Sequence, residues 1–226
     1  MPTPEPLHFA VLAADLVILT IRNDNILVRL INVDRPPYFV NVAGLPGGLL
    51  KPDETAEDAA NRHLREKALI DPKKSYIEQL YTFSRTDRDP RGRVVAVAYI
   101  ALVPWESLSP TEQSSDSQVY WCEISKATHL AYDHDEVLSL AIARLRARIS
   151  YTTVIGKLLT KTFTLTELEE AYGTILGTVL DKRNFRKKIL KLGILQERPE
   201  KLTGAAHRPA RLYSFSSPDV QTIEIL

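Results

Sequence analysis

The sequence predicts an α+β protein of two domains, residues 1–150 and residues 151–226. The chain has 226 residues, whereas single domains usually contain about 100–150 residues. Segments rich in Val and Ile, typical of strands, dominate the first hundred residues. After Ser150 the pattern changes to short amphipathic helices and a hairpin. This change sets the expected boundary between the domains.

The composition is that of an ordinary soluble protein, with 44% hydrophobic residues, 25% charged residues and a net charge of +1. No apolar run approaches the roughly 20 residues that a membrane span needs. Residues 1–6 also lack the basic-then-apolar pattern of a signal peptide. We therefore expect a cytoplasmic protein without membrane contact. The single cysteine, Cys122, lies among apolar residues, which indicates a core position and not a nucleophile.

The expected strands of the first domain are apolar segments separated by turn residues. The dipeptide Asn23-Asp24 separates the first two segments and predicts a β-hairpin. The glycine-rich stretch 44–48 breaks the pattern after the third segment and predicts a loop. Strands are expected at residues 9–20, 25–32, 38–42, 76–83, 94–103 and 119–123.

Two helices are expected among these strands. One begins near Thr55, because apolar residues recur every four positions after it and form a single stripe. The other covers residues 135–150, and Asp133 with Glu136 has the spacing of a capping box at its start. The mixture of strands and helices indicates an α+β domain.

The second domain has the local signals of two short helices and a hairpin. Thr164 and Glu167 form a capping box before the first helix, and Asp181 is a good N-cap for the second. Residues 194–198 and 211–215 form the expected hairpin. Helix, turn, basic helix and hairpin is the order of a winged helix-turn-helix, whose second helix enters the major groove of DNA.

Basic residues are concentrated at this end of the chain. Between Lys182 and Arg211, ten basic residues face only Glu197 and Glu200, which suits a polyanion. Arginine can read guanine and asparagine can read adenine, whereas lysine suits phosphates. A solvated charged face and a protein-binding winged helix are the alternatives. The expected DNA contacts are Lys182, Arg183, Asn184, Arg186 and Lys187 on the helix, and Lys201, His207, Arg208 and Arg211 in the hairpin.

The segment from Gly48 to Ile70 resembles the Nudix box. That box reads Gly, five residues, Glu, seven residues, then Arg-Glu-aliphatic-x-Glu-Glu-x-Gly-aliphatic. The resemblance implies the Nudix fold, a mixed sheet between helices, over roughly residues 8–148. His63, Lys67 and Leu69 stand where the family has Glu, Glu and Gly. The residues that match are Gly48, Glu54, Arg62, Leu64, Glu66 and Ile70.

These substitutions predict that hydrolysis has been lost. Nudix hydrolases hold a divalent metal ion against a pyrophosphate with helix glutamates, since Mg²⁺ prefers carboxylate oxygens. His63, Glu66 and Lys67 lie three and four positions apart and sum to about zero charge at neutral pH. We expect Glu66 to pair with Arg62, and the histidines show no metal-ligand spacing. The sequence predicts no catalytic residue, no metal site and no cofactor, with an active pyrophosphatase as the alternative.

The whole chain resembles the NrtR family, the Nudix-related transcriptional regulators of NAD metabolism in bacteria. The resemblance rests on the box and on residues 88–103, 130–138, 180–195 and 208–215. It implies a homodimer that represses genes of NAD biosynthesis or salvage by binding palindromic operator DNA. It also implies ADP-ribose, or a related NAD-derived nucleotide, as the ligand that releases the DNA. A regulator of sugar catabolism is the alternative, because related Nudix regulators respond to sugars.

Ligand contacts are expected around the glycine loop and the polar loop after residue 83. The loss of two carboxylates makes the box less repulsive to a pyrophosphate. The arginines of the polar loop are candidates for ligand contacts, with simple solvation as the equal alternative. The helix at 135–150 leads from His134 into the second domain and is the expected route of a ligand signal. The candidate ligand residues are Gly47, Gly48, Arg62, Glu66, Arg85, Arg88, Arg91 and His134.

Overall fold

A computed structural model describes residues 9–202, 210–223 and 225. Within this part, a seven-stranded sheet is followed by a smaller three-stranded sheet. The strands of the first sheet are β1 (Val11–Arg22), β2 (Asn25–Arg35), β3 (Phe39–Gly44), β4 (Gly47–Leu49), β5 (Tyr76–Phe83), β6 (Val94–Leu102) and β7 (Val119–Glu123). The helices that accompany it are α1 (Ala56–Glu66), α2 (Pro110–Gln113) and α3 (His134–Tyr151), with short 3₁₀ turns η1 (Pro72–Lys74) and η2 (Trp105–Ser107).

The large sheet is mixed, as expected. Its main order is β3-β2-β1-β6-β5, with β4 paired to β1 and β7 paired to β2. The pair β1 and β6 is parallel, whereas the other pairs are antiparallel. The expected strands and the hairpin at Asn23-Asp24 are confirmed, with small shifts at their ends. The expected loop at 44–48 is partly wrong, because Gly47 and Gly48 pair with Asp15 and Ala14 of β1.

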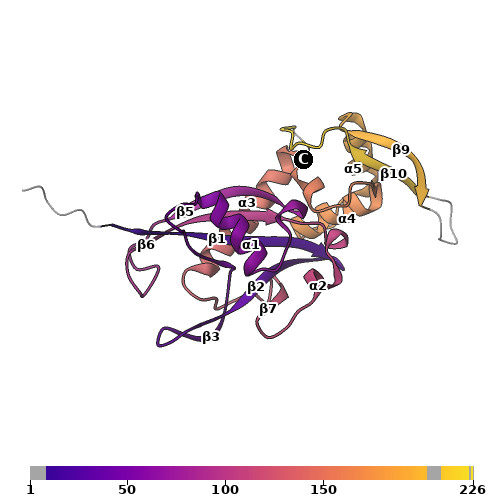
Figure 1. The fold of residues 1–226 in the computed structure, drawn as a ribbon. Coiled ribbons are helices and arrows are strands. Elements are labelled where there is room, and N and C mark those ends of the chain that lie inside the picture. Colours follow the sequence, from indigo (N-terminus) through magenta and orange to yellow (C-terminus); the bar gives the residue numbers. More distant parts are fainter. Residues whose placement is uncertain (1–8, 203–209, 224, 226) are drawn as a thin grey trace, which may run out of the picture.

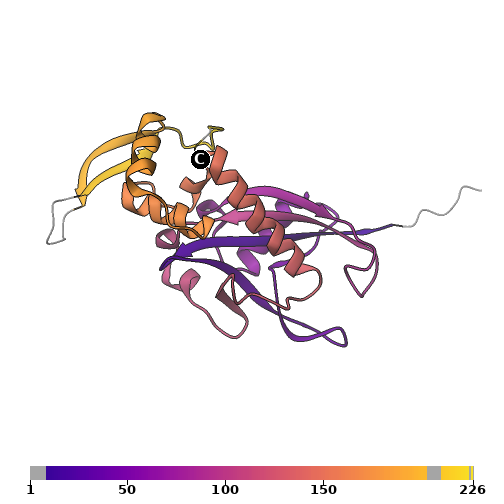
Figure 2. The ribbon, with the colours of Figure 1, turned by 180° about the vertical axis from the view of Figure 1, so that it is seen from behind.

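The strand β1 is apolar on both faces because each face is covered by a helix. Leu16 and Ile18 belong to the core cluster that includes Leu64 of α1. The alternate residues Val17 and Leu19 belong to the cluster that contains the apolar side of α3. Figure 1 shows α1 in front of the sheet, and Figure 2, the view from behind, shows α3 crossing the opposite face. The sheet therefore lies between two helices.

The starts of α1 and α3 differ. Thr55 caps α1 and forms a capping box with Asp58, as the sequence pattern there suggests. The capping box expected at Asp133 and Glu136 is wrong, because the Asp133 side chain makes no capping hydrogen bond. Its carboxylate instead accepts two hydrogen bonds from Arg88, at 2.8 and 2.7 Å. A tertiary ion pair has replaced the local cap.

The second part of the chain has the expected winged-helix order. Thr164 and Glu167 form a capping box, and Asp181 accepts hydrogen bonds from the N–H groups of Arg183 and Asn184. Both predicted caps are confirmed. A two-residue strand, too short for a sequence signal, pairs with the hairpin. The elements are η3 (Thr153–Lys157), β8 (Phe163–Thr164), α4 (Leu165–Leu176), α5 (Lys182–Lys191), β9 (Leu195–Leu202) and β10 (Ala210–Phe215), with the small sheet in the order β8-β10-β9.

Helix α3 joins the two parts through a continuous core. The cluster that holds Val17 also holds Tyr172 of α4 and Phe185 of α5. In addition, Arg146 of α3 donates to the Ile175 carbonyl at 2.9 Å. Helix α3 therefore packs against both the large sheet and the winged helix.

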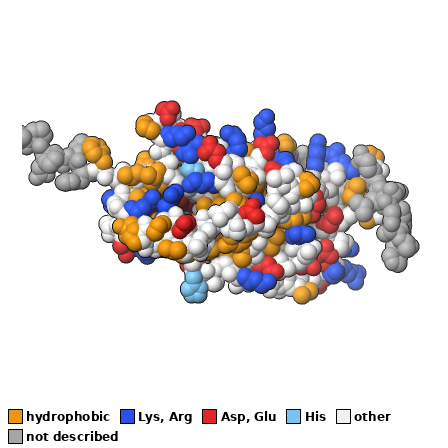
Figure 3. All heavy atoms as spheres, turned by 60° about the horizontal axis from the view of Figure 1, so that its bottom comes forward, with side chains coloured by type: hydrophobic (Ala, Val, Ile, Leu, Met, Phe, Trp, Pro, Cys, Tyr) orange, Lys and Arg blue, Asp and Glu red, His pale blue; other side chains and the backbone are white. Residues whose placement is uncertain are grey.

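The surface carries no dominant charge on the face shown in Figure 3, where basic, acidic and apolar side chains are intermixed. In the described residues, no helix is both long enough and apolar enough to cross a membrane. Cys122 is half-buried against the core, and burial raises the pKa of its thiol. Both features fit the interpretation of Cys122 as a packing residue.

Candidate ligand pocket and DNA-binding face

A cavity of about 500 Å³ opens beside the glycine loop, on the side of the sheet that carries β4. It is bounded by β1, the end of β2, β4 and the loop before β6. Its lining residues combine charged and apolar side chains. The polar and aromatic members are Asp15, Asn32, Asp34, Arg35, Lys67, Arg88, Asp89, Arg91, Gln118, Tyr132 and His134.

The glycine loop packs closely against β1 and the end of α1. A Cβ atom on Gly47 would lie 2.7 Å from the carbonyl oxygen of Ala14, a backbone atom that has little freedom to move. A Cβ atom on Gly48 would lie 2.8 Å from Nζ of Lys67 and 3.1 Å from Cε1 of His63. Both glycines line the cavity. The loop therefore holds its backbone against β1 and against the end of α1.

The two substituted box positions lie at this loop. His63 is buried, and burial, aided by the charges of Lys67 and Arg62, lowers its pKa to about 4. It is therefore neutral at pH 7. Lys67, the C-cap of α1, donates from Nζ to the carbonyl oxygen of Gly47. A neutral imidazole and an ammonium occupy the positions where the box has glutamates.

These residues do not fit a divalent metal ion. Of the three box positions that carry metal-binding glutamates, only Glu66 keeps a carboxylate, which is exposed and lies 3.7 Å from Nη1 of Arg62. Within the described residues there is no group of three His, Cys, Asp or Glu side chains that could hold a metal. An ammonium beside the loop would also repel a cation.

The main partner of Arg62 is Glu54, a contact that the sequence reading missed. Arg62 Nε donates to Glu54 Oε2 at 2.9 Å, and Nη2 donates to Oε1. This pair lowers the pKa of the Glu54 carboxyl to about 2. Nη2 also donates to the carbonyl oxygen of Leu49 at 3.2 Å. Both charged residues are box positions, so their shared spacing is the signal that could have suggested the pair.

Arg88 forms a buried bridge between two elements. Its guanidinium contacts Asp15 of β1 at 3.0 Å and binds Asp133 at the start of α3 through two hydrogen bonds. All three side chains are buried, and Arg88 and Asp15 line the cavity. We call this group the Arg88 bridge. It ties the floor of the cavity to the first turn of α3.

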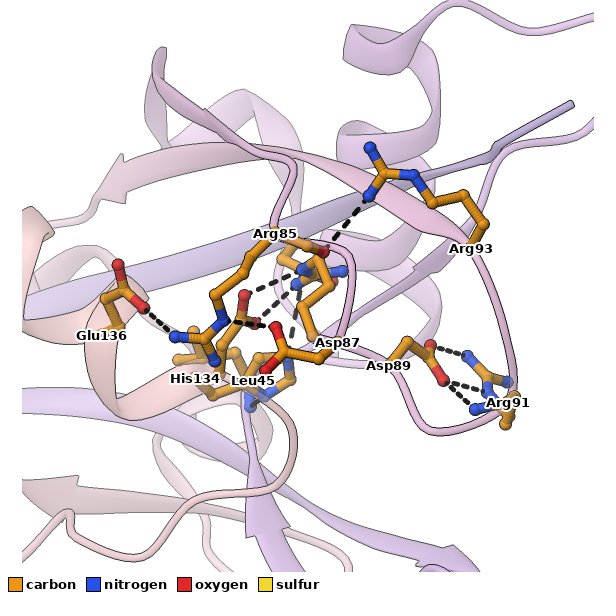
Figure 4. Close-up of polar contacts among 11 residues, drawn as sticks. Leu45, Arg85, Asp87, Asp89, Arg91, Arg93, His134 and Glu136 are labelled. Atoms are coloured by element: carbon orange, nitrogen blue, oxygen red, sulfur yellow. Dashed lines mark hydrogen bonds and ion pairs between the residues drawn. The ribbon is translucent and has the colours of Figure 1, made fainter.

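His134 lies next to the Arg88 bridge. Its Nδ1 accepts a hydrogen bond from the Leu45 N–H at 2.9 Å, as Figure 4 shows. Burial lowers the pKa of the ring, so it is neutral with its proton on Nε2. Nε2 lies 3.8 Å from Asp15 Oδ2. The first residue of α3 thus contacts the loop that carries the cavity's glycines.

The remaining loop arginines differ in their surroundings (Figure 4). Arg91 binds Asp89 through two hydrogen bonds, at 3.0 and 2.7 Å, and lies over the Tyr132 ring. Arg85 is exposed and pairs with Asp87 and Glu136. Of the predicted ligand residues, Gly47, Gly48, Arg88, Arg91 and His134 line the cavity, whereas Arg62, Glu66 and Arg85 do not.

Several lining residues were not among the predicted ligand residues, including Asp15, Tyr132 and Lys67. Asp15 lies within an apolar strand, and only the fold brings it to Arg88. Tyr132 has a left-handed backbone, with φ of 58°, and its ring lies 4.5 Å from that of Phe39. Lys67 was read only as a lost metal ligand. Its contact with the loop could have been suspected from its place in the box.

The basic side chains of helix α5 form two rows that differ in their ion pairing. Arg183 and Lys187 are exposed, and the described residues include no ion pair to either. The other row faces α4, because Lys182 and Arg186 lie 3.5 and 3.3 Å from the buried carboxylate of Glu169. Only one of the two cationic rows is therefore unpaired.

The structure describes only some of the other predicted DNA contacts. The Asn184 side chain donates to Asp181 at 2.7 Å, which adds to the cap of α5. Arg211 is exposed and lies 3.0 Å from Glu197 across the hairpin. The Lys201 side chain, His207 and Arg208 lie outside the described residues. Their role in DNA binding stays a prediction.

Comparison with known proteins gives two domain matches. The family model of the NUDIX domain matches residues 11–141. The model of the NrtR DNA-binding winged helix domain matches residues 155–215. The matched segments include the candidate pocket and helix α5 respectively.

Similar proteins come from Acinetobacter baylyi and Shewanella oneidensis. The ADPR responsive transcriptional repressor NtrR of Acinetobacter baylyi is 34% identical over 220 residues, which cover 96% of this chain and 84% of that protein. Shewanella oneidensis NrtR, solved in complex with a 27mer DNA, matches with a TM-score of 0.79 and 32% identity over 91% of this chain and 93% of that one. The NUDIX domain of the same Shewanella protein, solved with ADP ribose, matches with a TM-score of 0.53 and 32% identity. This match covers 64% of this chain and 94% of that one. The chain therefore belongs to the NrtR family of Nudix-domain, winged-helix proteins.

Proposed function

We propose that this protein is a transcriptional repressor whose winged helix binds operator DNA and whose Nudix pocket binds ADP-ribose or a related NAD-derived nucleotide that releases the DNA. Relatives that bind DNA and ADP-ribose support this. The operator is palindromic and is read by a homodimer, because a two-fold protein suits a two-fold site. The genes under control are those of NAD biosynthesis or salvage.

The observation that carries this proposal is the Arg88 bridge. A ligand in the cavity meets Arg88 and Asp15 directly, and the same Arg88 holds Asp133 at the start of α3. Helix α3 then packs on the winged helix through Arg146. A ligand that prefers one position of α3 can therefore change the placement of α5, with a typical coupling of about 1–3 kcal/mol.

The same site supports a sensor without hydrolysis. A neutral His63 and a cationic Lys67 lie where the Nudix box supplies glutamates to a metal ion. The loss of two of these carboxylates removes ligands that hold the metal ion in Nudix hydrolases. We therefore propose that the protein binds the nucleotide and does not cleave it.

The test is a titration of the protein bound to a fluorescent operator duplex, followed by anisotropy. ADP-ribose, NAD, nicotinamide mononucleotide, arabinose and xylose are added separately, and the products are examined by chromatography. We expect ADP-ribose or a related nucleotide to release the DNA and to remain intact with Mg²⁺ or Mn²⁺. Release by a sugar alone would instead assign the protein to sugar catabolism. Cleavage of ADP-ribose that Glu66→Ala abolishes would show an active pyrophosphatase.

A further inference from the structure

Lys67 combines a fixed position with unused hydrogen-bonding capacity. Its ammonium has three N–H donors, and one of them binds the Gly47 carbonyl oxygen. Within the described residues, Nζ has no other hydrogen bond and no ion pair. The side chain lines the cavity. Two donors on a positively charged group are therefore available to a ligand there.

Positive charge is concentrated around Lys67. Burial, followed by the charge of Arg35, lowers the pKa of its ammonium, and Arg91 acts in the same direction. Asp15 opposes these effects, but its carboxylate is already held by Arg88 at 3.0 Å. Cations that crowd together away from bulk water repel one another. A bound anion would relieve this repulsion.

The glycine loop leaves Lys67 accessible at short range. Because Gly48 has no side chain, Nζ lies 2.8 Å and His63 Nε2 lies 3.4 Å from the point that a Cβ would occupy. Among the residues that the structure describes, the buried His63 Nε2 has no hydrogen-bond partner. An acceptor oxygen beside Gly48 would be within reach of the ammonium. A phosphate group supplies such oxygens together with the negative charge.

We propose that Nζ of Lys67 binds the diphosphate of the nucleotide in place of the divalent metal ion that Nudix hydrolases hold there. This inference rests on the proposed function, in which the pocket binds an ADP-ribose-like ligand. Lys67 supplies a fixed cation and two N–H donors, so nucleotide binding needs no metal. The substitution that removed the metal ligand thus added a ligand contact.

The test measures binding by calorimetry on the full chain, in EDTA and in Mg²⁺, with ADP-ribose and with inorganic pyrophosphate. Wild-type protein should bind equally well under both conditions. Lys67→Ala should weaken binding about 10–150-fold, the range for one hydrogen bond to a charged group, and Lys67→Arg should retain most of it. Lys67→Glu should bind poorly in EDTA and recover in Mg²⁺. Thermal unfolding checks that each variant is folded.

The matched control is Lys73→Glu, which makes the same charge change on the exposed turn η1, outside the cavity. It should leave binding unchanged. If ADP-ribose fails to bind but pyrophosphate binds in a Lys67-dependent way, the proposed effector is wrong and the role of Lys67 stands. Metal-dependent binding by wild type, equal binding by Lys67→Ala, or no binding of pyrophosphate by wild type would overturn the inference.

Discussion

The ligand pocket and helix α5 both contain clustered cations, but the ion pairing of these cations differs. In the pocket, Arg88 lies between Asp15 and Asp133, and Arg91 binds a neighbouring carboxylate. On α5, the outer row of Arg183 and Lys187 is exposed without an ion pair among the described residues. A paired, buried arginine such as Arg88 fixes geometry, whereas exposed cations without an ion pair offer charge to a partner.

This difference assigns separate tasks to the two regions. The pocket must hold a small ligand and transmit a shift, so Arg88 is fixed in a bridge that spans three segments of the chain, while Lys67 keeps donors for the ligand. The DNA face must attract a polyanion, which depends on uncompensated charge and on counterion release. A count of basic residues does not distinguish the pocket from the DNA-binding face, whereas the ion-pair partners of those residues do.

The largest expected effect comes from breaking the Arg88 bridge. Arg88→Ala leaves two buried carboxylates without a partner, which should destabilise the fold by about 3–5 kcal/mol. The free energy of unfolding, measured by urea denaturation, checks this. The control is Arg85→Ala in the same loop, because Arg85 is exposed and should cost less than about 0.5 kcal/mol. Equal effects at the two positions would show that the bridge is not a structural link.

The bridge also marks the limit of sequence reading in the pocket. The sequence places Arg88 in a polar loop, yet its partners lie 73 and 45 residues away in the chain. No local pattern encodes such a contact. The failed capping box at Asp133 has the same cause, since a distant arginine competes for the carboxylate.

Helix α5 could be predicted much more fully. Its cap at Asp181, its buried Phe185 and its basic side all follow from local spacing, and the structure contains each of them. The unequal rows could not be predicted, because they depend on how α4 packs beside α5. Glu169 reads as an ordinary surface glutamate until the fold buries it. The cap, the core residue and the basic side of α5 could thus be predicted from the local sequence, whereas the ion pairs between α4 and α5 could not.

The second prediction concerns pH and the neutral His63. Its folded-state pKa of about 4 lies below the unfolded value of 6.5, so between these values the unfolded chain binds a proton that the folded chain does not. Stability is therefore lost as pH falls through this window, by about 2 kcal/mol between pH 7 and pH 5. Urea unfolding at both pH values measures the loss.

The matched variant for this test is His63→Gln, which removes the titrating group. The buried His134, whose pKa is also lowered by burial, contributes in the same direction, so the slope should decrease and not vanish. A variant with the full wild-type pH dependence would contradict the assignment to His63. Comparing this variant with wild type thus tests whether His63 in the folded pocket stays uncharged because burial and the neighbouring cations disfavour its protonated form.

The third prediction tests the unpaired row of α5. Arg183→Ala should cost about 1–3 kcal/mol of operator binding and relax specificity at one base pair, if the side chain reads a base. Lys187→Ala should weaken all sequences alike and reduce the salt dependence by about one counterion. Anisotropy titrations on operator and scrambled duplexes at several salt concentrations separate the two results. Wild-type affinity in both variants would mean that α5 is not the recognition helix.

The smallest expected effect belongs to the paired row, and it sharpens the contrast within α5 itself. Arg186 donates to Thr166 at 3.0 Å and lies 3.3 Å from Glu169, so it must leave these partners before it can contact DNA. Arg186→Ala should therefore reduce operator affinity by less than Arg183→Ala does, by under about 1 kcal/mol. Glu169→Gln should release Arg186 and raise affinity slightly. If Arg186→Ala instead weakens binding as much as Arg183→Ala, DNA competes successfully with Glu169 and both rows of the helix read the operator.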